Sequence, residues 1–233
     1  MSGEVILIIF QVVILIMSVV IHEVSHGWIA LKLGDPTAKY AGRLTLNPIN
    51  HFDLWGSFLV PIFMIFTFNF GFGWAKPVPY NPYNLRDQKK GPALVALAGP
   101  GSNIFTAIIF AIGAKLIPLS YVVKAEIAKN IFDFEELGVL LSGSFAAIFF
   151  WLFMMILTIN VFLAVFNLIP IPPLDGSKIL YAFTSISEQK KMALEQFGFI
   201  FLLIFIFFFS APLGYVLSLV LSLFFKYIVG ITI

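Results

Sequence analysis

The sequence predicts an all-α polytopic membrane protein with about five transmembrane helices, a re-entrant segment and short membrane-associated β-strands. Of the 233 residues, 60% are hydrophobic and only 11% are charged. A soluble domain carries about 25% charged residues, so a water-facing globule could not bury this apolar excess. The apolar residues also fall into long runs, separated by polar breaks that contain glycine and proline. We expect one domain over residues 1–233, with a core at 1–187 and a C-terminal helical pair at 188–233.

The spanning helices are predicted from the apolar runs in chain order. The first run begins at Val5 and stays compatible with a helix to about Leu33. The MSGE ahead of it has no Lys or Arg and no small-residue cleavage site follows, so we expect a retained helix rather than a removed signal peptide. The other predicted spans are residues 93–119, 144–169, 192–211 and 213–230. The last two meet near Pro212, which predicts a tight turn between them.

Other regions do not have the pattern of a simple spanning helix. Residues 54–70 are apolar but contain Gly56 and Pro61, which favours a segment that dips into the membrane and returns. Residues 71–92 are rich in glycine and proline with β-compatible residues between, which favours short extended strands. Residues 120–143 are mixed in character and predict a short amphipathic helix.

Composition excludes several classes of function. The chain contains no cysteine, which rules out thiolate catalysis, cysteine-ligated zinc and structural disulfides. The formal net charge is only +2, and no basic tract suits a phosphate backbone. We therefore expect no nucleic-acid partner.

A His-Glu-x-x-His motif occupies residues 22–26, near the end of the first apolar run. His22 and His26 lie one helical turn apart, a spacing that lets two imidazoles bind one zinc ion while Glu23 activates the metal's water. Ionisable side chains inside a membrane span are costly and mark functional sites. His22 lies about 26 Å along the helix from Val5, so the motif falls inside a hydrocarbon core of about 30 Å, close to one face. The alternative is a helix end at the interface whose polar side chains are merely solvated.

A catalytic zinc ion needs a third protein ligand, with water in the fourth position. The candidates are His51 and three carboxylates, Asp53, Asp175 and Glu4. Asp175 is favoured because the rigid stretch IPIPP precedes it. The alternative for Asp175, a plain N-cap of a helix over 176–186, is supported equally well by the sequence. We interpret His51 as a structural hydrogen-bonding residue near the cavity, with Asp53 as its partner.

The motifs together resemble the site-2 protease family of intramembrane zinc metalloproteases, peptidase family M50. HEVSH in the first apolar run and NLIPIPPLDG after a later one carry the resemblance, while LAGPGSN, GWAKPVPYNP and NPINHFDLWGS are similar to the compact branch without PDZ or CBS domains. The resemblance implies a Zn²⁺ endopeptidase that cuts in or near transmembrane segments of membrane-protein substrates. It implies His22, His26 and Asp175 as zinc ligands, Glu23 as general base and later acid, and Asn167 as the residue that holds the substrate or the oxyanion.

One metal ion joining the first span to Asp175 would put both at the same membrane face, so an even number of crossings must separate them. The spans 93–119 and 144–169 supply two, which leaves 54–70 as a segment that does not cross. The active-site face then carries eleven of the 14 Lys and Arg residues, and the other face carries three, Lys115, Lys124 and Lys129. The positive-inside rule therefore predicts an active site at the cytoplasmic face of the plasma membrane and an N-terminus outside.

Substrate contacts are predicted in two polar segments. Lys76, Pro77, Val78 and Pro79 lie in a stretch, 71–83, that offers an extended edge to a partly unwound substrate, and the resemblance points the same way for 40–50. The alternative is that these segments only pack at the interface. Asn103 is a further candidate for substrate contact, although packing or loop anchoring is the favoured interpretation for it.

Two other functions remain open from the residues alone. One is a metal-binding membrane protein without protease activity, such as a transporter or a pseudoenzyme. The ionisable groups cluster at one face instead of lining several spans, which disfavours a transport pathway. The other is a membrane scaffold in which HEVSH is accidental. The sequence does not indicate the identity of the substrate or the oligomeric state.

Overall fold

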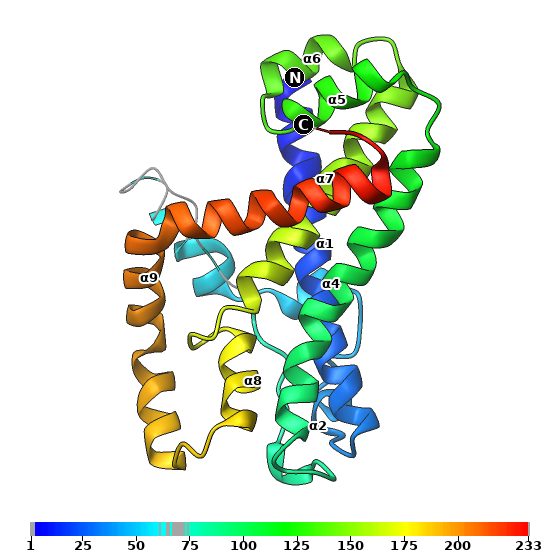
Figure 1. Ribbon diagram of the computed structural model, residues 1–233. Helices are drawn as coiled ribbons and strands as arrows, with labels where there is room; N and C mark the ends of the chain where they lie inside the picture. Colours follow the sequence, from blue (N-terminus) through cyan, green and yellow to red (C-terminus); the bar gives the residue numbers. More distant parts are fainter. Residues whose placement is uncertain (1–2, 61, 64–65, 67–72, 74, 233) are drawn as a thin grey trace.

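A computed structural model describes residues 3–60, 62–63, 66, 73 and 75–232 of the chain (Figure 1). Within these residues all regular structure is helical. The α-helices are α1 (Gly3–Lys32), α2 (Thr37–Tyr40), α4 (Gly91–Leu116), α5 (Tyr121–Lys129), α6 (Phe134–Leu140), α7 (Phe145–Asn167), α8 (Asp175–Phe183) and α9 (Glu188–Leu223). Short 3-10 or π-helical turns are η1 (Pro48–His51), η2 (Leu54–Leu59), η3 (Pro82–Asn84) and η4 (Phe224–Val229).

Helices α1, α4 and α7 run side by side and form the centre of the molecule (Figure 1). On α4, Ala107, Ala111 and Ala114 are fully buried in one cluster with Phe150 and Trp151 of α7. Small residues at this spacing let two apolar helices approach closely, which is how spanning helices gain packing energy without a hydrophobic driving force. The central bundle therefore has the packing expected of helices that meet within a membrane.

The end of the bundle that holds both chain termini is closed by α5 and α6 (Figure 1). Lys124 on α5 is buried, and its Nζ donates to the carbonyls of Ala114 and Lys115 at the end of α4, 3.2 and 2.9 Å away. Thr232 meets the same cap, because its backbone N–H donates to the hydroxyl of Tyr121 over 3.1 Å. The C-terminus thus lies beside the N-terminus, at the end opposite to α8.

Among the described residues, four helices are long and apolar enough to cross a membrane: Gly3–Lys32, Gly91–Leu116, Phe145–Asn167 and Glu188–Val229. The prediction of about five spans is wrong, because residues 192–211 and 213–230 belong to one bent helix. Pro212 lacks an N–H and its ring crowds the preceding turn, and the backbone leaves helical geometry at Phe209 (φ −117°, ψ 17°). The helix bends there and continues in a new direction without reversing (Figure 1).

The predicted membrane-associated β-strands are also wrong for the described residues, in which no strand occurs. Residues 75–81 form neither a helix nor a strand, and their hydrogen-bond partners are scattered. Lys76 N–H donates to the carbonyl of His51 at 2.9 Å, whereas Val78 N–H donates to a side chain. Pro77 and Pro79 have no N–H, so a backbone ladder cannot continue along this segment.

Part of the predicted re-entrant segment, 54–70, lies outside the described residues. Its start is η2, which Asp53 caps by accepting from Gly56 N–H at 2.7 Å. The hydrogen bond between Lys76 and His51 joins the two ends of the region that contains it. His51 and Lys76 therefore lie side by side, and among the described residues α4 and α7 are the candidate spanning helices between His26 and Asp175.

Candidate metal centre and active site

His22 and His26 lie in the second half of α1, with ring planes at 85° to each other and Nε2 atoms that converge. Their Nε2 atoms are 3.0 Å apart, and the residues are 5% and 9% exposed. The pair follows directly from the helical repeat, which puts positions four apart on one face. Each ring is held from its other nitrogen: His22 Nδ1 is 2.6 Å from Asn103 Oδ1, and His26 Nδ1 is 2.7 Å from the carbonyl oxygen of Val95.

Asp175 completes the cluster from a distant part of the chain. Its Oδ2 lies 3.1 Å from Nε2 of both His22 and His26. Among the described residues, these three side chains form a group that could hold a metal ion. Asp175 is the first residue of α8, whose N-cap is Leu174, and no side-chain hydrogen bond caps the helix. The carboxylate of Asp175 therefore faces the imidazoles and not the N–H groups of its own helix.

The charge state of Asp175 suits a metal ligand. Burial acts to raise the pKa of its carboxyl group, but imidazoles at His22 and His26 that carry a proton on Nε2 donate to it and hold the pKa well below its usual range; a bound metal ion would take the place of those protons. The group is an anionic carboxylate at neutral pH. A carboxylate and two neutral imidazoles are a ligand set found in catalytic zinc sites.

The three donor atoms fit a zinc ion. Bonds of 2.0–2.1 Å in tetrahedral geometry separate two donors by about 3.3 Å, close to the 3.0 and 3.1 Å found here. Val95 offers only an acceptor, so the Nδ1 of His26 carries the proton and its Nε2 presents a lone pair toward Asp175. Lone pairs this close repel one another unless a cation lies among them, and a divalent ion satisfies all three.

Gly99 on α4 leaves the room that such an ion requires. A Cβ at this position would lie 2.4 Å from Nε2 of His26 and 2.5 Å from Nε2 of His22. Any larger residue would therefore occupy the space in front of both nitrogens. The backbone of α4 forms one wall of the metal centre.

Glu23, beside His22 on α1, is half-buried, and its Oε2 accepts a hydrogen bond from the N–H of Val78 at 2.9 Å. Val78 reaches α1 because Gly27 lies under it: a Cβ on Gly27 would be 2.8 Å from a methyl group of Val78. Segment 76–79 is thus packed against the helix that carries the candidate metal ligands.

Two further contacts hold segment 76–79 in place. Arg43, which is buried, donates from Nη2 to the carbonyl of Lys76 at 2.6 Å. Asp35, which is fully buried, accepts from the N–H of Asn81 at 2.7 Å and from the side-chain amide of Asn84 at 2.9 Å. The side chains of Lys76, Pro77 and Pro79 remain exposed, and that of Val78 is buried.

The remaining predicted site residues lie as follows. Asn103 is fully buried, and both ends of its amide are engaged, by His22 and by Asn160. Asn167 is half-buried at the end of α7, where its Nδ2 donates to the carbonyl of Leu163 at 2.9 Å. His51 is buried, and its Nε2 is 2.9 Å from the carbonyl of Thr45; the carboxylate of Asp53 accepts from Gly56 N–H instead of meeting His51.

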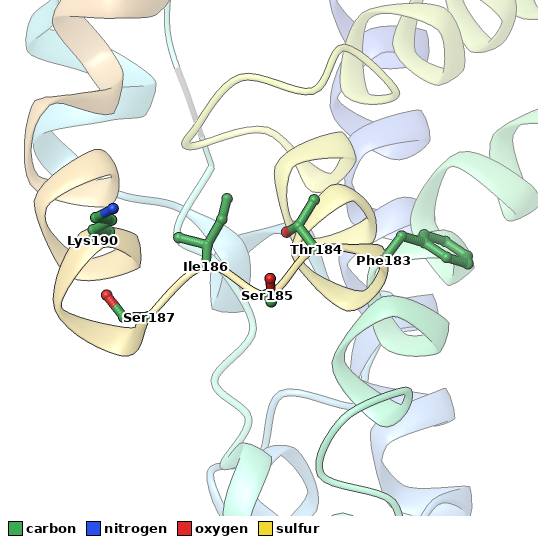
Figure 2. Close-up of a pocket in the computed structure, with 6 residues that line it drawn as sticks. All are labelled: Phe183, Thr184, Ser185, Ile186, Ser187 and Lys190. Carbon is green, nitrogen blue, oxygen red and sulfur yellow. The ribbon is translucent and has the colours of Figure 1, made fainter.

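The turn between α8 and α9 forms a shallow hollow on the surface (Figure 2). Its lining residues are Phe183, Thr184, Ser185, Ile186, Ser187 and Lys190. None of them belongs to the metal cluster, so we assign this hollow no catalytic part.

Sequence reasoning missed Gly99, Asn160, Ser18 and Asp35. Signals for three of them were present: Ser18 precedes His22 by one helical turn, Gly99 precedes Asn103 by one turn, and Asn160 is an amide inside an apolar span. For Asp35 the only local partner among the described residues is Thr37, two residues on, and its contacts with Asn81 and Asn84 come from far along the chain.

Spanning helices, one of which carries a His-Glu-x-x-His motif facing a distant aspartate, define the class as a zinc-dependent membrane hydrolase. Comparison with known proteins gives the family. The model for Peptidase family M50 matches residues 10–208, and the chain belongs to this family.

The chain is 36% identical over 206 residues to YwhC of Bacillus subtilis (strain 168), whose name describes it as a candidate zinc metalloprotease; the match covers 88% of this chain and 82% of YwhC. It is 27% and 26% identical over 190 residues to the Rip2 proteins of Mycolicibacterium smegmatis and Mycobacterium tuberculosis, which are named in the same way. Those matches cover 81% of this chain and 63% of each Rip2 protein. No solved structure gives a significant match.

The protein is therefore an integral membrane zinc metalloendopeptidase that acts on polypeptide substrates with zinc as its cofactor. The predicted family, enzyme class and cofactor are confirmed.

Proposed function

We propose that the protein is an intramembrane endopeptidase that hydrolyses peptide bonds in or near the transmembrane segments of membrane-protein substrates. In this proposal His22, His26 and Asp175 hold the zinc ion and Glu23 is the general base. The supporting observation is the position of the cluster: two buried imidazoles on an apolar spanning helix, with a carboxylate 3.1 Å from each. A polypeptide that is itself in the membrane is the substrate within reach of such a site.

Zinc, when bound, lowers the pKa of a water molecule toward about 7 and polarises the scissile carbonyl group. The carboxylate of Glu23 takes the proton of the attacking water and later delivers it to the leaving amine. One oxygen of Glu23 is already engaged by the N–H of Val78. The other oxygen is the one we assign to the proton transfer.

We assign Asn167 to the developing oxyanion. Its Nδ2 carries two hydrogens, of which one is used by the carbonyl of Leu163. The position of Asn167 at the last turn of α7, ahead of the loop that leads to Asp175, supports this assignment.

We assign Lys76, Pro77, Val78 and Pro79 to substrate binding, as an extended surface without a β-ladder. Alternate residues of an extended chain point to opposite sides. The N–H groups of Lys76 and Val78 are used by His51 and Glu23, whereas Pro77 and Pro79 are exposed residues that have no N–H and can offer only their carbonyls. The free edge therefore suits a substrate backbone that donates its own N–H groups.

We further propose that the enzyme lies in the plasma membrane with its active site near the cytoplasmic face. With four spans, Lys226 moves to the side of the termini, which leaves ten of the 14 Lys and Arg residues on the active-site face. The positive-inside rule still favours the cytoplasm for that face.

The test is cleavage of a single-span reporter protein by the full chain in liposomes, with zinc content measured on the same samples. We expect one zinc per chain, and cleavage that a zinc chelator stops and added zinc restores. Asp175→Ala should lose both zinc and cleavage, whereas Asp133→Ala, a carboxylate that caps α6 at the opposite end, should keep both. Cleavage by zinc-free protein, or by Asp175→Ala, would refute the proposal.

A further inference from the structure

Three polar side chains inside the bundle connect to His22 and to one another. They are Ser18 on α1, Asn103 on α4 and Asn160 on α7, and they are 4%, 0% and 0% exposed. Each comes from a different candidate spanning helix, and all three are buried. We call these three residues the asparagine relay.

The hydrogen bonds of the relay run in a fixed direction. Asn160 Nδ2 donates to the backbone carbonyl of Ile156 at 2.8 Å and to Ser18 Oγ at 2.9 Å. Because a carbonyl can only accept, the nitrogen of Asn160 is defined, and its Oδ1 must face the other way. That oxygen accepts from Asn103 Nδ2 at 2.7 Å.

The direction set by Ile156 then passes to the metal ligand. With its nitrogen on Asn160, Asn103 presents Oδ1 to Nδ1 of His22 at 2.6 Å. An amide oxygen accepts, so His22 Nδ1 carries the proton and its Nε2 keeps the lone pair. This is the ring nitrogen that faces Asp175.

We propose that Asn103, Asn160 and Ser18 are positioning residues, which hold the His22 ring in the tautomer and orientation that bind the metal. This inference rests on the proposed role of His22 as a zinc ligand. Hydrogen-bond partners of a ligating histidine commonly affect metal affinity 10- to 100-fold. The alternative is that the relay only joins α1, α4 and α7 through interhelical hydrogen bonds, without affecting the metal.

The test compares zinc affinity, by chelator competition, for the full chain in detergent micelles. Asn103→Leu and Asn160→Leu remove the relay with side chains that suit an apolar core, and we expect a 10- to 100-fold loss of affinity. Asn103→Asp and Asn160→Asp keep the accepting oxygen that faces His22 or Asn103, so their affinities should lie closer to wild type. Thr158→Val is the matched control, because Thr158 is a buried residue of α7 whose hydroxyl has no hydrogen-bond partner among the described residues.

The visible absorption of the cobalt-loaded variants reports ligand geometry independently of activity. We expect a changed spectrum for the leucine variants and a wild-type spectrum for Thr158→Val. If a leucine variant does not fold, Ser18→Ala decides: a smaller loss of affinity is expected, because the Asn160 amide keeps only one of its two acceptors. Unchanged zinc affinity in Asn160→Leu or in Ser18→Ala would overturn the proposed positioning role. An equal loss of zinc affinity in Thr158→Val would overturn it as well. Wild-type protein without zinc, or His22→Ala with full zinc, would instead contradict the proposed function.

Discussion

The carboxylate of Glu23 accepts a hydrogen bond from the backbone N–H of Val78, 2.9 Å away, although 55 residues separate them. This bond ties the proposed general base to the segment that we assign to the substrate. A peptide held along residues 76–79 would lie in a fixed register with Glu23 and, through the helix, with His22. The proposed general base and the proposed substrate surface are therefore held in a fixed position relative to each other.

Glu23→Gln tests the proposed general base without removing the hydrogen bond from Val78. Glutamine keeps a carbonyl oxygen that accepts from Val78, but it cannot take a proton from water. We expect reporter cleavage to fall by about 10²- to 10⁴-fold, with zinc still bound. Glu195→Gln, in the exposed first part of α9, is the matched control and should cleave like wild type. Near-normal cleavage by Glu23→Gln would remove Glu23 from the mechanism.

Gly99→Ala tests the wall of the metal centre. The added methyl would lie 2.4 Å from Nε2 of His26, so we expect zinc affinity and cleavage to fall together. Gly101→Ala is matched in chemistry and helix, and its Cβ meets nothing within 4 Å. That control should bind zinc normally and gain about 0.5–1 kcal/mol of stability from helix propensity. Normal zinc content in Gly99→Ala would mean that the ion lies elsewhere.

Asp35→Ala tests the attachment of segment 76–79. Asp35 joins the loop after α1 to Asn81 and Asn84, so its loss should loosen the segment without reaching the metal. We expect impaired cleavage, mainly through a higher KM, with one zinc retained per chain. The buried donors left without a partner should also lower the free energy of unfolding by about 2 kcal/mol. Loss of zinc in Asp35→Ala would contradict the claim that Asp35 holds segment 76–79 without affecting the metal site.

Asp35 also gives a pH dependence of known sign. Burial acts to raise its pKa, but donors from Thr37, Asn84 and the backbone outweigh burial and lower the pKa from 3.8. A lowered pKa in the folded protein contributes stability above the unfolded value, and that stability is lost as pH falls through the folded pKa. The melting-temperature difference between wild type and Asp35→Ala should therefore be constant near pH 7 and shrink below about pH 4. A difference that grows on acidification would show that another group dominates.

The topology can be tested with single cysteines, because the natural chain has none. Thr232→Cys and Lys129→Cys should react with an impermeant thiol reagent from outside intact cells. Lys89→Cys and Lys190→Cys should react only after the membrane is opened. Labelling of residues 190 and 232 from the same side would mean that the chain crosses the membrane twice between them, and five times in all.

Local patterns in the sequence carried the class of the protein. Residues four apart on a helix share a face wherever that helix lies, so HEVSH predicts a pair of imidazoles without knowledge of the fold. The apolar excess predicts a membrane protein in the same direct way, and both predictions agree with the family.

The sequence left the third candidate metal ligand undecided, because its identity depends on distances between residues that are far apart along the chain. The sequence supported Asp175 equally as a metal ligand and as a helix cap, and the packing of α8 against α4 brings its carboxylate to the imidazoles. The same holds for Gly99 and Asn160, whose partners lie on other helices. The strand prediction failed for a local reason that the pattern understated: Pro77 and Pro79 remove the donors that a ladder needs.

By itself the sequence determined the membrane class, the zinc motif and the family resemblance, because each depends on composition or on spacing within one helix. Only the tertiary structure decided that Pro212 bends a single helix, that the two termini share one end of the bundle, and that His22 is linked through Asn103 to Asn160. Those features depend on which helices pack together and on where buried polar groups find their partners. A linear pattern does not contain that information.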